Sequence, residues 1–219
     1  SYSQTEWCDM FLLTIISGTS KPIGLSKLIR YLHKEENVSI TEFYNSFYQD
    51  LIKPKKFLND ELNQRIGGLP NMLYDLVDPN SPSTDFDIDI GPNFPGFLSP
   101  NLFFVFSVML HPKAFFESLE VTMLPKVKNK ERLSDLIDYL INSFIDINFD
   151  PIIGRKFTTQ YNWFEYFNNN KYQLTQSQYI FKILDENLKF AGSTEFEFSD
   201  YPAIDDYDQK VIQFFYHRA

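Results

Sequence analysis

Apolar residues recur along the first part of the chain at the three- and four-residue intervals of amphipathic helices. Ser3-x-x-Glu6 and Ser39-x-x-Glu42 both have the capping-box pattern, in which the serine hydroxyl and the glutamate carboxylate each satisfy a free backbone N–H. Helices are therefore expected to begin at these two serines. The first should be a short buried helix that ends near Ser17-Gly18 and carries Trp7, Met10, Phe11, Leu13 and Ile15.

The same periodicity predicts several further helices. Pro100 can open a helix, and the pair His111-Pro112 should break or kink it. Gly67-Gly68 is expected to separate one helix from the apolar stretch that follows it. The expected helices cover residues 22–32, a segment after Ser39 with Phe43, Phe47 and Leu51 on one face, and residues 57–65, 69–77, 100–110, 114–124 and 133–144.

After Asp146 the residue pattern becomes typical of β structure. Aromatic, threonine and alternating residues predict strands within 156–160, 172–184 and 194–198, and helical spacing returns over 205–218. The predicted fold class is α+β and predominantly α-helical, with a bundle-like N-terminal two-thirds, a small antiparallel sheet and a final helix. A single domain over 1–219 is expected, with sub-boundaries in the Pro-rich, acidic segment 78–100 and near 146–155.

Composition narrows the possible functions. The chain has 219 residues, and its 43% hydrophobic content is enough for a self-sufficient core. A net charge of −9 argues against nucleic acid as a partner. The most apolar run, 98–110, is too short and interrupted to span a membrane. The chain begins Ser-Tyr-Ser-Gln without an initiator methionine, which is typical of a fragment or a processed chain.

The single cysteine, Cys8, excludes an internal disulfide and any thiolate-only metal site built by this chain alone, so a cytoplasmic setting is expected. Its place in a predicted buried helix indicates packing rather than reactivity. The glycine pairs lack the spacing of nucleotide-binding loops. No catalytic residue is predicted.

Asp85, Asp87 and Asp89 alternate with apolar residues and are the only metal-ligand candidates, for a divalent cation. Glycine and glutamate are not at the calcium-loop positions, so we favour a strand with solvated aspartates and no metal site. His33, His111 and His217 lie in unrelated contexts and form no zinc-binding pair.

The densest aromatic segment is Tyr161-Asn162-Trp163-Phe164-Glu165-Tyr166-Phe167. Tyr161, Asn162, Trp163 and Glu165 are candidates to face a substrate, because polar groups framed by rings suit a polar ligand. The interpretation we favour is a strand or turn that anchors the core through a buried Trp163.

Ser3-x-x-Glu6-Trp7, Phe43-Tyr44 with Phe47, the segment 145–151 before Arg155, and Tyr161-Asn162-Trp163-x-Glu165-Tyr166-Phe167 together resemble the C-terminal region of cobalamin-binding radical S-adenosylmethionine enzymes. Such enzymes carry, upstream, a cobalamin-binding domain and a barrel whose CxxxCxxC cysteines hold an iron–sulfur cluster. The resemblance implies a non-catalytic accessory module that packs on the catalytic core, in the same polypeptide or a partner chain, and helps to shape the substrate cavity.

On this prediction the iron–sulfur cluster, S-adenosylmethionine and cobalamin belong to the parent enzyme, and this chain holds no cofactor. The alternative is a stand-alone binding or scaffold domain that recognises a small molecule or a peptide through an aromatic pocket. A CxxxCxxC motif upstream of Ser1 in the reading frame would decide for the first prediction.

Overall fold

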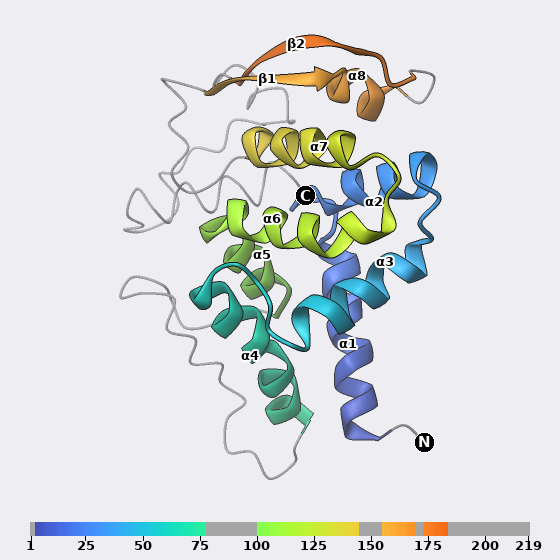
Figure 1. Ribbon diagram of the computed structural model, residues 1–219. Coiled ribbons are helices and arrows are strands. Elements are labelled where there is room, and N and C mark those ends of the chain that lie inside the picture. The colour runs from blue at the N-terminus through green and yellow to red at the C-terminus, as the bar shows by residue number, and fades with distance from the viewer. Residues whose placement is uncertain (1–2, 78–99, 145–154, 170–172, 184–219) are drawn as a thin grey trace, which may run out of the picture. The chain divides into compact units, whose positions relative to one another are not determined.

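The computed structural model describes residues 3–77, 100–144, 155–169 and 173–183 (Figure 1). The chain divides into two compact units, Ser1–Ile137 and Asp138–Ala219, and the division falls inside a helix. The described part is mostly helical with one small antiparallel sheet, which confirms the predicted α+β, predominantly helical class. The expected strand within 194–198 and the expected final helix lie outside the described residues, as do nearly all of 78–100 and 146–155.

The N-terminal unit is built from consecutive helices. They are α1 (Gln4–Thr19), α2 (Leu25–Glu35), α3 (Ile40–Ser46), the π-helical turn η1 (Phe47–Ile52), α4 (Asp60–Val77), α5 (Pro100–Leu110), α6 (Pro112–Met123), the 3-10 turn η2 (Leu124–Lys126) and the first part of α7 (Lys130–Ser143). Within this unit α1, α4 and α5 pack against one another. None of the described helices combines the length and the apolar character needed to cross a membrane.

Both predicted helix starts are confirmed. The Ser3 hydroxyl accepts a hydrogen bond of 3.2 Å from the Glu6 backbone N–H, and the Ser3 backbone N–H donates to the Glu6 carboxylate at 2.7 Å. The Ser39 hydroxyl accepts from the Glu42 backbone N–H at 3.0 Å. Pro100 opens α5, and the chain breaks at His111 before α6, as the prolines predicted.

The structure corrects the prediction that Gly67-Gly68 separates two helices, because α4 runs without interruption through both glycines. Glycine weakens a helix interior by only about 1 kcal/mol, which packing can offset. At Gly67 the reason for the small residue is visible. A Cβ there would lie 2.8 Å from the Lys55 side chain, whose aliphatic part crosses the helix at this point.

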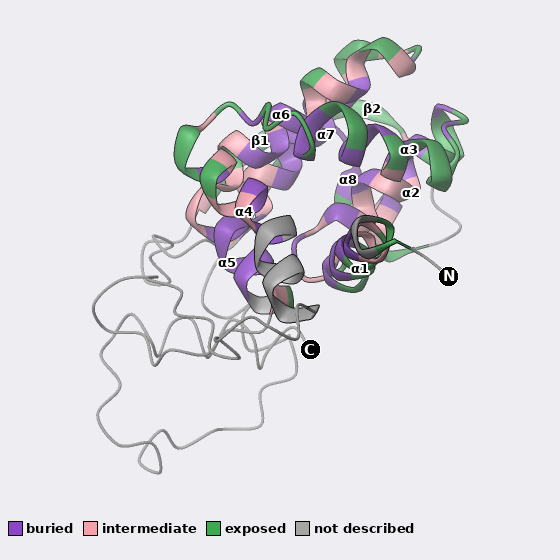
Figure 2. Cartoon of the chain, turned by 90° about the horizontal axis from the view of Figure 1, so that it is seen from below, coloured by how far each residue is buried: buried purple, intermediate pink, exposed green. Residues whose placement is uncertain are grey.

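A cluster of phenylalanines forms the centre of the N-terminal unit. The ring of Phe115, in α6, lies 5.9 Å from Phe47, 6.1 Å from Phe57, 6.2 Å from Phe104 and 5.4 Å from Phe116. Most of these contacts are edge-to-face, the geometry that the ring quadrupoles favour. In Figure 2 the buried positions, drawn in purple, run along α5 and α6. Many of the aromatic side chains of this unit therefore pack in its core.

The C-terminal unit contains the last residues of α7, strand β1 (Arg155–Tyr161), the short helix α8 (Trp163–Asn168) and strand β2 (Gln176–Ile183). The two strands pair antiparallel, with Phe157 opposite Phe181 and a bulge between Thr159 and Tyr161. Both strands were predicted. The segment that begins at Trp163 was expected to be a strand or turn, and the structure corrects this to a six-residue helix.

Arg155 connects the sheet to the end of α7. Its Nη1 donates to the carbonyls of Phe144 at 3.0 Å, Asn142 at 3.3 Å and Ile141 at 3.4 Å. These are carbonyls of the last helical turn or just beyond it, which have no partner within the helix, and a cation there also complements the helix dipole. The guanidinium thus closes α7 and positions the first residue of β1.

Candidate functional site

The predicted substrate-facing segment folds around Trp163, which is completely buried. Its ring lies 5.6 Å from Tyr161, 6.0 Å from Tyr166 and 5.9 Å from Phe167, the last in a stacked arrangement. Tyr161 itself is 6% exposed. The favoured interpretation, that Trp163 anchors a core, is therefore confirmed, and these two rings lie inside the unit.

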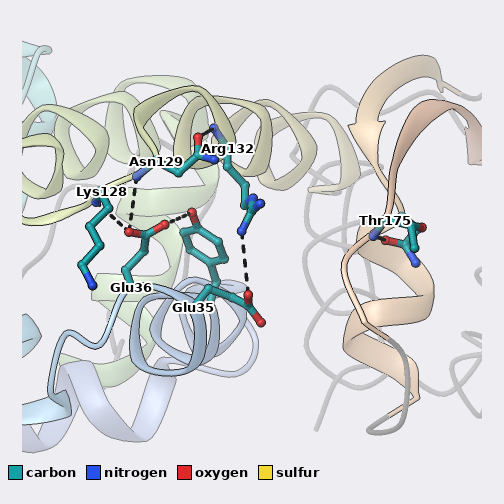
Figure 3. Close-up of polar contacts among 8 residues, drawn as sticks. Glu35, Glu36, Lys128, Asn129, Arg132 and Thr175 are labelled. Carbon is teal, nitrogen blue, oxygen red and sulfur yellow. Dashed lines mark hydrogen bonds and ion pairs between the residues drawn. The ribbon is translucent and has the colours of Figure 1, made fainter.

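Asn162 is also buried, and it holds the chain that leads into β2. Its Oδ1 accepts a hydrogen bond of 2.8 Å from the Thr175 backbone N–H, and its Nδ2 donates to the Gln173 carbonyl at 3.2 Å. Figure 3 labels Thr175. The hydroxyl of this residue lies 2.7 Å from the Tyr179 hydroxyl. The amide of Asn162 thus supports a loop by its own hydrogen bonds.

Among the predicted substrate-facing residues, Glu165 is the one with a buried polar atom that makes no hydrogen bond in the described part of the chain. It is half-buried on α8, and its Oε2 is buried with no hydrogen-bond partner in the structure. Burial raises the pKa of the Tyr139 hydroxyl to about 12, and the Glu165 charge adds to this shift. The neighbouring Phe164, which was not singled out from the sequence, is 55% exposed.

Helix α1 carries a second candidate surface, and here the structure corrects the expectation of a helix buried throughout. Cys8, Leu12, Ile15 and Ile16 form its buried side, whereas Met10 is 43% exposed and Phe11 is 37% exposed. The rings of Trp7 and Phe11 stack with centroids 5.1 Å apart. Trp7, Met10 and Phe11 stand at positions i, i+3 and i+4, which places them on one side of the helix. We call these three residues the α1 face.

The burial of Glu36 could not be anticipated from its neighbours, because it ends a run of charged residues. In the structure Glu36 is 5% exposed, and its carboxylate accepts hydrogen bonds from the Tyr31 hydroxyl at 2.7 Å and the Lys128 backbone N–H at 2.6 Å (Figure 3). Burial, reinforced by the hydrogen bond to Glu36, raises the pKa of Tyr31. The hydrogen bonds of this carboxylate come from other residues of the chain, so the carboxylate links separate elements of the fold.

The remaining ionisable candidates come from different elements of the fold. Cys8 packs in the core, and burial raises the pKa of its thiol. His33 is exposed on α2, and His111 Nε2 lies 3.1 Å from a carboxylate oxygen of Glu61. No group of three metal-ligating side chains occurs within the described ranges. Asp85, Asp87, Asp89 and His217 lie outside those ranges.

Comparisons with known proteins add no relative. No protein-family model matches the chain, and no curated protein sequence matches it significantly. The fold defines the class, a predominantly helical α+β protein, and the resemblance to radical S-adenosylmethionine enzymes stays a prediction from sequence.

Proposed function

We propose that this chain is a non-catalytic docking module, the C-terminal accessory region of a cobalamin-dependent radical S-adenosylmethionine enzyme. The observation that carries the proposal is the α1 face, where Met10 and Phe11 are exposed and the half-buried Trp7 stacks on Phe11. Aromatic residues and methionine are enriched where proteins meet. The occupant we assign to this face is the catalytic core.

The order of segments in that family supports the assignment. Its catalytic domains precede a region of this kind in sequence, so α1 would be the first element of the module to meet them. Trp7 is both part of the α1 face and part of the Ser3-x-x-Glu6-Trp7 motif on which the resemblance rests. Trp7, which is half-buried, thus belongs both to the sequence pattern and to the α1 face.

The residues of this chain do not fit the cluster of the parent enzyme. A radical S-adenosylmethionine cluster needs three cysteines, whereas Cys8 is the only cysteine here and is 4% exposed among core residues. The cluster, S-adenosylmethionine and cobalamin would therefore be held by the catalytic core. The contribution of this module would be to cover that core and to help enclose its substrate.

The alternative function, recognition of a small molecule or peptide in an aromatic pocket, has less support. Trp163 and Tyr161, the rings that would frame such a pocket, are buried in contact with each other. Among the four candidate residues of this segment, Glu165 is the one with a buried polar atom that makes no hydrogen bond in the described part of the chain. A pocket built on this segment would first have to open the core.

The test begins with the reading frame upstream of Ser1, which should encode a CxxxCxxC motif. That upstream segment is then expressed as a separate polypeptide, and its binding to this chain is measured by analytical ultracentrifugation. Replacing Met10 and Phe11 together by glutamate should weaken binding at least tenfold. Val121→Glu, at a residue that is 59% exposed on α6, is the matched control and should leave binding within twofold. An upstream frame without the motif, or equal binding by both variants, would overturn the proposal.

A further inference from the structure

The turn between η1 and α4 carries three lysines within four residues. Lys53, Lys55 and Lys56 are all exposed, and we call residues 53–56 the basic loop. None of these lysines forms an ion pair with another described residue. The basic loop therefore presents three ammonium groups that the described part of the fold does not neutralise.

The surroundings of the basic loop do not supply the missing negative charge. Asp50 and Asp60 are the nearest acidic residues in the sequence, and neither pairs with a lysine of the loop within the described ranges. The chain as a whole has 29 acidic and 20 basic residues. The dipole at the end of η1 favours some positive charge here, but its effect is confined to the last helical turn.

Lys55 holds a backbone conformation that usually belongs to glycine. Its φ is 54°, and its N–H donates to the Ile52 carbonyl at 3.0 Å, which helps to close η1. Glycine would close the turn at this position without strain. The stem of Lys55 lies across α4 instead, where it fills the space that a Cβ of Gly67 would take. Because this stem is packed, less side-chain freedom is lost when its ammonium group binds a ligand.

The segment after the basic loop anchors it to the core. Phe57 is buried, and its backbone exchanges two hydrogen bonds, of 2.7 and 2.8 Å, with the Asn63 side chain. The Leu58 N–H donates to the Ser118 hydroxyl at 2.9 Å, while the Leu58 side chain is 59% exposed. An apolar side chain thus stands two residues after Lys56 on a fixed backbone.

From this arrangement we infer that the basic loop binds an acidic segment of a partner protein, whose carboxylates pair with the three lysines and whose apolar side chain packs on Leu58. Charge complementarity selects the acidic partner. A small anion fits less well, because every backbone N–H of residues 53–58 that could cradle it already donates within the fold. Nucleic acid requires positive charge along many phosphates, which three lysines in a chain of net charge −9 do not supply. This inference is independent of the α1 face and of the proposed function.

The test uses the whole chain and a fluorescein-labelled peptide in which glutamate and leucine alternate. Fluorescence anisotropy should show saturable binding with a Kd below about 1 mM, and added salt should weaken it. The same peptide with glutamine in place of glutamate should bind at least about tenfold more weakly. Equal binding of the two peptides, or no saturation up to about 1 mM, would overturn the inference. Tighter binding of an oligonucleotide or of phosphatidylserine vesicles than of the acidic peptide would overturn it as well.

A triple variant, Lys53→Gln with Lys55→Gln and Lys56→Gln, should lower the affinity for the acidic peptide at least about tenfold. Glutamine keeps much of the stem that packs on α4, so Tm should change by no more than about 3 °C. The control makes the same change in net charge by replacing three other exposed lysines of the N-terminal unit with glutamine, namely Lys21, Lys128 and Lys130. It should leave affinity within about twofold. If both triple variants weaken binding alike, the effect is one of overall charge and the inference fails.

Lys55→Gly tests the packed lysine by itself. Glycine takes a φ of 54° without strain, so the turn should still close and the far-ultraviolet circular dichroism spectrum should be unchanged. Affinity for the acidic peptide should fall about threefold or more, because one ammonium group is lost. An affinity equal to that of the wild-type chain would show that Lys55 takes no part in binding, and the arrangement we infer would be wrong.

Discussion

The carboxylate of Glu36 accepts a hydrogen bond of 2.6 Å from the backbone N–H of Lys128, a residue 92 positions further along the chain. It also accepts one from the Tyr31 hydroxyl and a longer one, of 3.4 Å, from the Asn129 backbone N–H. Asn129 in turn accepts from the Arg132 backbone N–H at the start of α7. One buried carboxylate therefore joins the end of α2 to the entry of α7.

Glu36→Gln should destabilise the N-terminal unit by about 1–3 kcal/mol, because an amide cannot accept from all of these donors and leaves a buried group unsatisfied. The matched control is the adjacent Glu35→Gln. Glu35 lies 3.8 Å from Arg132 in a partly exposed ion pair, and such pairs contribute at most about 1 kcal/mol. Urea unfolding followed by circular dichroism measures both. A smaller loss for the Glu36 variant than for the Glu35 variant would contradict the role we assign to Glu36.

Phe115→Ala should cost about 3–5 kcal/mol, because the ring touches four other aromatic rings and its removal leaves a cavity. Phe164→Ala is the comparison, since that ring is 55% exposed and should change stability by no more than about 0.5 kcal/mol. Thermal and urea unfolding of the two variants would show the contrast. Similar losses would mean that Phe164 contributes to packing far more than its exposure indicates.

The two neighbouring glycines of α4 should respond differently to alanine. Gly68 has open space where a Cβ would be, so Gly68→Ala should stabilise the helix by about 0.5–1 kcal/mol. Gly67→Ala gains the same helix propensity but forces the Lys55 side chain to move from contacts of 2.8–2.9 Å. It should therefore be the less stable of the two variants. We expect a lower Tm for Gly67→Ala than for Gly68→Ala. The reverse order would contradict the packing of Lys55 on α4.

Tyr139 makes the C-terminal unit sensitive to alkaline pH. Its pKa is raised to about 12 in the folded chain, first by burial and then by Glu165, whereas an unfolded tyrosine has a pKa of about 10. The protonated hydroxyl is favoured by folding, so its contribution is complete below about pH 10. It falls by about 1.4 kcal/mol per pH unit as the pH rises toward 12.

Comparing unfolding of the wild-type chain and Tyr139→Phe at several pH values from 8 to 11.5 measures this effect. The difference in stability between the two should be constant below about pH 9.5 and shift against the wild-type chain above pH 10. A difference that stays constant through pH 11.5 would show that Tyr139 titrates normally in the folded state.

Local patterns predicted most of the helices because the forces that start and stop a helix act within a few residues. The Ser3 and Ser39 caps, Pro100 and His111-Pro112 lie where the structure places helix ends. The prediction at Gly67-Gly68 was wrong because the preference of glycine against helix is weak, and the packing of α4 on α1 and α5 can offset it. At α1 apolar residues surround the helix, and periodicity cannot distinguish the side that packs on α4 and α5 from the side that carries Met10 and Phe11.

Signals between near neighbours in the chain were enough to establish the class of the fold, the helix starts, the two described strands and the packing roles of Cys8 and Trp163. Three features came from the folded arrangement alone: Glu36 is buried, Phe11 is exposed and the Lys55 side chain lies across Gly67. The features predicted from sequence and those found only in the structure depend on interactions of different range along the chain. Capping and alternation are set by neighbours in the chain, whereas burial of a charge or exposure of a ring depends on residues that folding brings together from distant parts of the sequence.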